Sequence, residues 1–245
     1  MFGRTLAFAG VAVLALALPV AAIAEPVQDL TVKATPNKAS SKKSPKSAKL
    51  SVSLGSRETT AGVQPPTLSK AVIYFPAGAK YNGAKFPVCK ATAIDAAKST
   101  DECPAGSIIG KGKAAGQAPG GVTQTDLTIV AANGGKNKVN LFVEGASPLR
   151  IQSNIVGTMS PATGAYGLKL SVPVPANLQE PAPGVPVAIT LFAVDIQKSM
   201  KKAGKTVPIF EITKCTGGTW KAKGEFSYAG GVPSKTVETS QKCTK

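Results

Sequence analysis

Four cysteines are the residues whose type and spacing could do chemistry in this chain, and they stand at Cys89, Cys103, Cys215 and Cys243. Cysteine thiolates bind zinc, exchange electrons as Cys-x-x-Cys pairs, or join as disulfides. Neither local pair has the spacing of a zinc knuckle, no Cys-x-x-Cys is present, and the chain contains no histidine. We therefore predict two disulfides paired in sequence order, Cys89–Cys103 and Cys215–Cys243, because each pair brackets a local loop or hairpin.

The sequence contains few of the residue combinations that catalyse reactions in enzymes. A serine or cysteine nucleophile lacks its usual histidine base. The run SMKKAGKT (199–206) is similar to the end of a phosphate-binding loop, but Ser199 stands where that motif needs glycine, so we expect a lysine-rich turn. Of the 13 acidic residues, only Asp195 falls inside a strongly apolar strand, and we expect it to be either an exposed strand end or an ion-pair partner of Lys198. No catalytic residue, metal site or cofactor is predicted, although a glycan-directed hydrolase that uses carboxylates remains an alternative.

The first 24 residues are typical of a secretory signal peptide. Arg4 supplies a positive charge, residues 6–18 form an apolar run, and Ala22-Ile23-Ala24 forms a small-residue cleavage site. The run is short for a membrane-spanning helix. We therefore expect an exported protein, secreted or associated with the cell envelope, whose residues 25–245 form one domain that does not span the membrane.

The charge balance is strongly basic, with 29 basic against 13 acidic residues and a net charge of +16. All but three of the basic residues are lysines. Lysine is a strongly hydrated point charge, which suits diffuse attraction to polyanions better than specific reading of nucleic acid. We predict anionic envelope polymers or lipid headgroups as partners, unless the lysines only keep the surface soluble. The candidate residues are Lys38, Lys42, Lys43, Lys46, Lys49, Lys198, Lys201, Lys202 and Lys205.

Alternation of apolar and polar residues dominates the chain and predicts strands. Leu50, Val52 and Leu54 share one face of a strand, and Trp220 lies in phase with Phe226 and Tyr228. Helical periodicity is nearly absent, and it is compatible with one turn in residues 197–203 and with two turns in residues 91–99, inside the first disulfide loop. With 25 glycines and 19 prolines as well, the sequence predicts an all-β fold, an antiparallel β-sandwich of about a dozen short strands with one short helix in that loop.

The stretches between the predicted strands differ in composition. Residues 35–49 hold several lysines and no acid, which indicates an exposed connection between two strands. Residues 110–116 (GKGKAAG) are expected to form a turn with solvated charge, and the proline-rich residues 177–186 a bridging loop. Residues 205–245 could be a separable C-terminal β-hairpin.

Several blocks of the sequence resemble those of exported lysine-rich β-sandwich proteins of high-GC Gram-positive bacteria. These blocks are TPNKASSKKSPKSAKLSV (35–52), VIYFPAGAKYNGAKFPVC (72–89), CPAGSIIGKGKA (103–114) and CTGGTWKAKGEFSYAGG (215–231) with a closing QKC (241–243). The resemblance supports export and the β-sandwich, and it implies no activity. The function expected is a non-catalytic structural or binding role in the envelope or outside the cell, with a protein-interaction module that presents a sheet edge as a further alternative.

Overall fold

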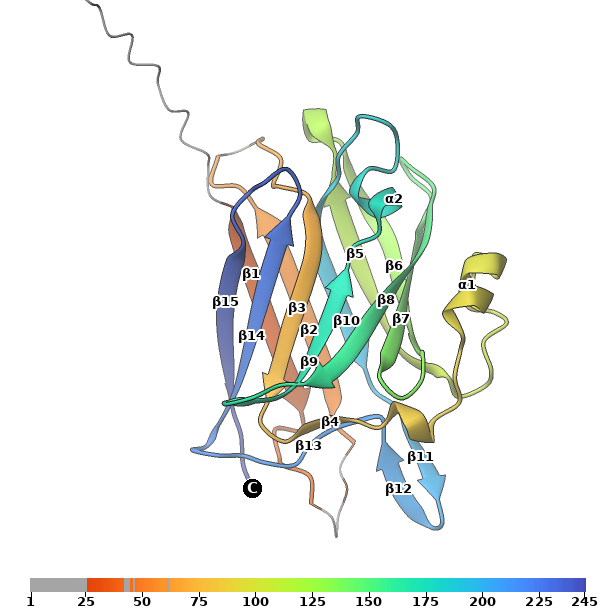
Figure 1. Cartoon of the computed structure of the whole chain (residues 1–245), viewed down its shortest axis with the longest axis vertical. Helices are drawn as coiled ribbons and strands as arrows, with labels where there is room; N and C mark the ends of the chain where they lie inside the picture. The colour runs from red at the N-terminus through yellow and green to blue at the C-terminus, as the bar shows by residue number, and fades with distance from the viewer. Residues whose placement is uncertain (1–25, 42–44, 46, 61) are drawn as a thin grey trace, which may run out of the picture.

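The computed structural model describes residues 26–41, 45, 47–60 and 62–245, and it is an antiparallel β-structure of two facing layers (Figure 1). The predicted all-β class is confirmed, with fifteen strands in the described chain where the sequence suggested about a dozen. The predicted signal peptide (1–24) and Lys42, Lys43 and Lys46 lie outside the described residues.

Eleven strands form one sheet in the order β1-β2-β10-β5-β6-β7-β8-β9-β3-β14-β15. Their bounds are β1 Val27–Thr35, β2 Lys49–Arg57, β3 Leu68–Pro76, β5 Ile108–Gln117, β6 Thr123–Asn133, β7 Lys138–Gly145, β8 Ile151–Pro161, β9 Tyr166–Pro173, β10 Ala188–Ile196, β14 Thr219–Tyr228 and β15 Lys235–Lys242. Two small sheets pair β11 (Ser199–Lys202) with β12 (Lys205–Pro208) and β4 (Ala79–Tyr81) with β13 (Phe210–Ile212). The large sheet folds over so that β9, β3 and β14 face β10 and β2 across the core (Figure 1).

The two edge strands of the large sheet, β1 and β15, come together at a seam that nearly closes it. The Gln241 side chain joins them: its Oε1 accepts from the Ala34 N–H at 2.8 Å, and its Nε2 donates to the Ala34 carbonyl at 2.9 Å. The Gln241 side-chain amide thus makes the two hydrogen bonds with Ala34 that the backbone of a neighbouring strand would otherwise make. Below it, Lys38 and Thr244 form a parallel bridge.

The alternation of apolar and polar residues along the strands explains which side chains form the core. Leu50, Val52 and Leu54 are buried as predicted, whereas the intervening serines are more exposed. Trp220, Phe226 and Tyr228 on β14 point into the same core. Apolar burial of this kind stabilises the folded state by about 25 cal/mol per Å² of apolar surface removed from water.

The glycine- and lysine-rich run after Cys103 is wrong as a predicted turn, because residues 108–117 form the central strand β5. Gly110 and Gly112 allow β10 to approach. A Cβ at these positions would lie 2.2 Å from the Asp195 carbonyl oxygen and 2.1 Å from the Ala193 carbonyl oxygen. The glycines therefore serve close strand packing, which sequence alone does not distinguish from a turn.

Helical structure is sparse in the described chain. The helix α1 (Ala91–Ala97) confirms the helix predicted inside the first disulfide loop, and α2 (Ala176–Gln179) is a single turn within the proline-rich segment. Two 3₁₀ turns cover Gly83–Lys85 and Pro119–Gly121. None of the described helices has the length and apolar character needed to cross a membrane.

The C-terminal strands belong to the large sheet. The strand β14 is hydrogen-bonded to β3 on one side and to β15 on the other. The strand β13 pairs with β4 through Phe210–Tyr81 and Ile212–Ala79. Residues 205–245 are therefore packed with the rest of the chain through backbone pairing of β12 with β11, of β13 with β4, of β14 with β3 and of Thr244 with Lys38.

Candidate anion-binding site

The two ends of the sandwich carry different charges. We call the lower end in Figure 1 the lysine end, made of the described residues of segments 36–41, 45, 47–48, 77–90, 103–107, 134–137, 197–218 and 243–245. Its described lysines are Lys38, Lys80, Lys85, Lys90, Lys136, Lys198, Lys201, Lys202, Lys205, Lys214 and Lys245, and its acid is Glu211. The described connections at the opposite end (58–60, 62–67, 118–122, 146–150, 174–187 and 229–234) carry only Glu58, Arg150 and Glu180 as charged residues. Positive charge is therefore concentrated at one end.

The hairpin β11–β12 projects from the lysine end (Figure 1). Its turn is formed by Ala203 and Gly204, whose φ angles of 48° and 72° are both positive, as in a type I′ turn. The Gly-Lys-Thr of the apparent phosphate-binding motif is thus a hairpin turn and the start of a strand, which confirms the lysine-rich turn predicted there. Lys201, Lys202 and Lys205 are fully exposed on it.

A hollow of about 210 Å³ lies between this hairpin and the neighbouring loops, and Lys80, Lys85 and Lys205 line it. Its other side is formed by Ser41 and Pro45 of the connection between β1 and β2. Glu211 also lines the hollow, and its carboxylate accepts from Ser40 Oγ at 2.9 Å. The hollow therefore presents three cations and one hydrogen-bonded carboxylate.

Asn82 fixes the lysine-bearing loop to the hairpin. Its backbone N–H donates to the Ile209 carbonyl at 2.8 Å, and its side-chain amide donates to the Pro208 carbonyl at 2.9 Å. Because Asn82 precedes the turn Gly83–Lys85, these bonds set the position of Lys85 relative to Lys205.

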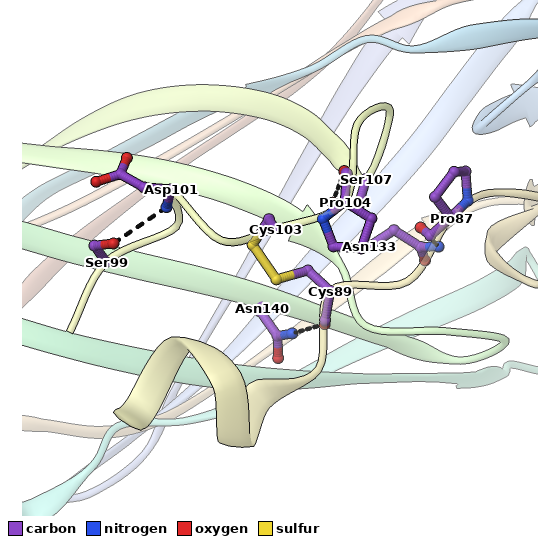
Figure 2. The surroundings of a disulfide bond; sticks show 9 residues. All are labelled: Pro87, Cys89, Ser99, Asp101, Cys103, Pro104, Ser107, Asn133 and Asn140. Atoms are coloured by element: carbon purple, nitrogen blue, oxygen red, sulfur yellow. Dashed lines mark hydrogen bonds between the residues drawn. A yellow bond between two sulfur atoms is a disulfide. The ribbon is translucent and has the colours of Figure 1, made fainter. Parts of the chain in front are cut away.

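Asn133, wholly buried at the end of β6, holds the same loop from inside. Its Nδ2 donates to the carbonyls of Gly83, Phe86 and Pro87, and its Oδ1 accepts from the Tyr81 hydroxyl at 2.7 Å. Burial raises the pKa of the Tyr81 phenol, so this donor stays protonated throughout the physiological range. Figure 2 shows Asn133 beside Pro87 and close to the first disulfide.

Both predicted disulfides are confirmed. Cys89 and Cys103 are joined with a Cα–Cα distance of 5.0 Å, and the Asn140 side chain donates to the Cys89 carbonyl at 2.8 Å (Figure 2). Cys215 and Cys243 are joined with a Cα–Cα distance of 5.9 Å. The first bond secures the loop that follows Lys85, and the second secures the C-terminus beside the lysine end.

The structure brings together only part of the predicted lysine set. Lys198, Lys201, Lys202 and Lys205 lie on or next to one hairpin, and Lys38 lies beside Thr244. Lys49 is engaged elsewhere, because its Nζ lies 2.9 Å from the Asp195 carboxylate.

Asp195 is exposed near the end of β10, as one of the two alternatives predicted, and it pairs with Lys49 on the neighbouring strand and not with Lys198. The hydrogen bond from Ser51 and the ammonium of Lys49 lower the pKa of Asp195. The register between β10 and β2 determines that Asp195 pairs with Lys49, since it places Asp195 directly opposite Ser51 on β2.

Sequence reasoning missed the lysines that complete the hollow, Lys80 and Lys85. Each stands alone between uncharged residues, so neither belongs to a charge cluster along the chain. They come close to Lys205 through the pairing of β4 with β13 and through the hydrogen bonds of Asn82 to Pro208 and Ile209. No local pattern in the sequence could have predicted that Lys80 and Lys85 lie close to Lys205.

Two carboxylates outside the lysine end, Glu225 and Asp126, have local structural partners. Lys223 Nζ donates to Glu225 at 2.7 Å and lies 4.3 Å from the centre of the Tyr74 ring, and this bond lowers the pKa of Glu225. Backbone N–H groups of Ala146 and Ser147 lower the pKa of Asp126. A general acid for glycoside hydrolysis requires the opposite shift. The described residues contain no group of three or more metal-ligating side chains.

The chain matches no protein-family model, no curated protein and no solved structure. The charge distribution and the geometry of the lysine end are therefore the observations that bear on function. Their arrangement suits an extended anion with several charges, since the lysines are spread over a hairpin, a hollow and neighbouring loops.

Proposed function

We propose that this protein is an exported, non-catalytic binding protein of the cell envelope that holds anionic polymers at its lysine end. The observation that carries the proposal is the segregation of charge: the connections at one end are rich in lysine, and those at the other end carry one arginine and two glutamates. The two disulfides are compatible with an oxidising compartment.

The lysines of this end are available to an external anion. Among the described residues, none of the lysines named above for this end forms an ion pair with an acid of the same chain. An ammonium group without an internal partner keeps its full attraction for a phosphate or carboxylate, and neighbouring ammonium groups repel each other until an anion arrives. Binding therefore relieves repulsion that the folded protein contains.

The arrangement also indicates how the polymer lies. One anionic group enters the hollow between Lys80, Lys85 and Lys205, where it meets three cations from two separate segments. Further groups of the same polymer run along Lys201 and Lys202 on the exposed hairpin. Lysine provides charge without the planar fork of arginine, so the site selects charge density and not a particular sequence of units.

The test is binding to immobilised poly(glycerol phosphate) over a salt series from 50 to 500 mM. The triple variant Lys201→Gln, Lys202→Gln and Lys205→Gln removes three charges from the lysine end. The control Lys33→Gln, Lys111→Gln and Lys113→Gln removes three charges from exposed strand positions. We expect the first variant to bind at least tenfold more weakly and the control to change less than twofold, with binding falling steeply as salt rises.

Equal losses in both variants would show that net charge, and not the lysine end, causes binding. Binding that does not respond to salt would contradict the charge mechanism itself.

A further inference from the structure

A gap between two neighbouring strands leads toward the interior of the sandwich. β8 and β9 pair only where Thr158–Pro161 meets Leu168–Ser171. Beyond this paired stretch the two strands diverge toward the opposite end (Figure 1). The segment 174–187, which contains α2, covers the space between them, and we call it the plug.

Two apolar cavities lie behind the plug. The first, of about 70 Å³, lies between the facing layers and is lined by Val52, Leu170, Val172 and Val194, among other apolar groups. The second, of about 50 Å³, is lined by Leu178 and Pro181 of the plug itself. Three wall residues are common to both cavities: Ile155, Ile189 and Phe192. The cavities therefore lie end to end with a shared partition.

Residues that point into the core at this place are incompletely buried. Leu168, Leu170 and Val172 on β9 are only half-buried, as are Ile189 and Phe192 on β10. On β3, the strand next to β9, Ile73 and Phe75 are 2% and 1% exposed. Protein interiors are normally packed as tightly as organic crystals. Apolar side chains of β9 and β10 thus face space that no other side chain of the described chain fills.

We propose that these cavities bind a single linear hydrocarbon chain, such as the alkyl chain of a lipid, which enters beside the plug. A closed cavity with an apolar wall stays dry and takes up apolar molecules, and an engineered cavity of about 150 Å³ admits benzene. The end-to-end arrangement favours a chain over a ring. Because the plug forms part of the second wall, moving it both opens the entrance and enlarges the space.

Few hydrogen bonds join the plug to the sheet, and one of them is a backbone bond at its first residue, from the Val174 N–H to the Ser69 carbonyl of β3 at 2.9 Å. Asn177 Nδ2 donates to Ser153 Oγ of β8 at 3.3 Å, and Gln64 Nε2 donates to the Pro186 carbonyl at 2.9 Å. Gln179 Nε2 donates to the Val174 carbonyl at 2.7 Å, within the plug itself. Side-chain bonds of this kind contribute little each, so the plug can open without unfolding the sheet.

The entrance is polar but nearly uncharged. Ser153, Asn177 and Gln179 surround it, and the connections at this end carry only Glu58, Arg150 and Glu180 as charged residues. A neutral headgroup can hydrogen-bond there while its chain lies inside. This ligand is distinct from the anionic polymer proposed for the lysine end, and either proposal can fail without the other.

The experiment uses primary alcohols from hexanol to dodecanol, which displace the fluorescent probe N-phenyl-1-naphthylamine from the purified protein. Each added methylene should tighten binding about fourfold until the chain fills the cavities, after which the gain should stop. Val172→Phe places a ring in the first cavity and should weaken binding at least tenfold. Val72→Phe makes the same change on the outer face of β3, opposite Ser171, and should leave the affinity unchanged.

The proposal is overturned by an equal effect of the two phenylalanine variants, by affinity that rises without a limit in chain length, or by displacement that does not saturate at one alcohol per protein. If Val172→Phe fails to fold, as seen by circular dichroism, Ala114→Leu fills the second cavity and takes its place.

The plug has its own test. Gln64→Ala removes the hydrogen bond that holds the plug at the Pro186 carbonyl, so association and dissociation of decanol should both become several-fold faster while the affinity stays the same. Unchanged rates would show that the chain does not enter beside α2.

Discussion

Asn133 is one residue on which the geometry of the lysine end depends. It satisfies the carbonyls of Gly83, Phe86 and Pro87 and accepts from Tyr81, all away from water. Asn133→Ala should lower the free energy of unfolding by about 3 kcal/mol or more, because buried polar groups lose their partners. Urea unfolding measures the change. Asn137→Ala, an exposed asparagine in the following turn, should change it by less than about 0.5 kcal/mol.

Asp195 gives a prediction for pH. Its pKa in the folded protein lies below the ordinary value of 3.8, so its stabilising effect is present above that value and disappears as the pH falls through the folded-state pKa. Asp195→Asn should lower stability at pH 7 by at most about 1 kcal/mol, since the Lys49–Asp195 pair is half exposed. The difference should vanish once the pH is below the folded-state pKa of Asp195. A difference that persists there would show that charge is not its cause.

Single residues also show where sequence reasoning succeeds. The cysteine pairing followed from local loops and from the absence of histidine. Trp220 was placed in the core by its phase with Phe226. Gly110 was misinterpreted, because a glycine that allows strands to approach looks the same in sequence as one that allows a turn.

At the scale of elements, the two disulfides secure different structures. The Cys89–Cys103 loop packs on the outer face of the sheet, where Ile94 and Cys89 contact Phe142 and Ala132. The Cys215–Cys243 bond lies beside the seam between β1 and β15. Their sequence separations are 14 and 28 residues.

Replacing each pair by serines should therefore give different results. Loss of Cys89–Cys103 should cost about 3 kcal/mol and speed hydrogen exchange mainly in α1. Loss of Cys215–Cys243 should cost about 3.5 kcal/mol and speed exchange at Ala34, whose N–H is bonded across the seam. Exchange that increases equally throughout the protein in both variants would contradict this local assignment.

Most strands could be predicted because one face of each is buried, and a strand with one buried face shows alternating apolar and polar residues in the sequence. Their order in the sheet could not, because β10 lies between β2 and β5 through contacts far apart in sequence. The sequence also could not predict that β9 is only half-buried, since Leu168, Leu170 and Val172 alternate with polar residues in the same way as fully buried core residues do. The apolar cavities therefore have no signal in the sequence.

At the scale of the whole molecule, the concentration of charge at one end predicts end-on contact with anionic surfaces. Acetylation of lysines in the presence of poly(glycerol phosphate) should be slowed at Lys80, Lys85 and Lys205, which line the hollow. Lys33 and Lys70, exposed on strands, should react as in the free protein. Mass spectrometry of the digested protein measures each position. Uniform protection would contradict end-on binding.

The lysine end as a whole could be predicted only in part. The lysine-rich stretches 35–49 and 198–205 were visible in the sequence because their charges are neighbours along the chain. The hollow was not, because its cations come from segments about 120 residues apart and meet only when β4 pairs with β13. The charge of the sequence led us to predict an anionic partner, and the topology shows which lysines lie together.

The seam at Gln241 bears on how the protein behaves at high concentration. A strand with unpaired backbone groups is a template on which another molecule can add a strand and begin a fibril. The Gln241 amide occupies the Ala34 backbone groups, and the folding over of the sheet turns its two edges toward each other. Each molecule thereby pairs its own two edges, and we expect it to resist strand addition by other molecules at high protein concentration.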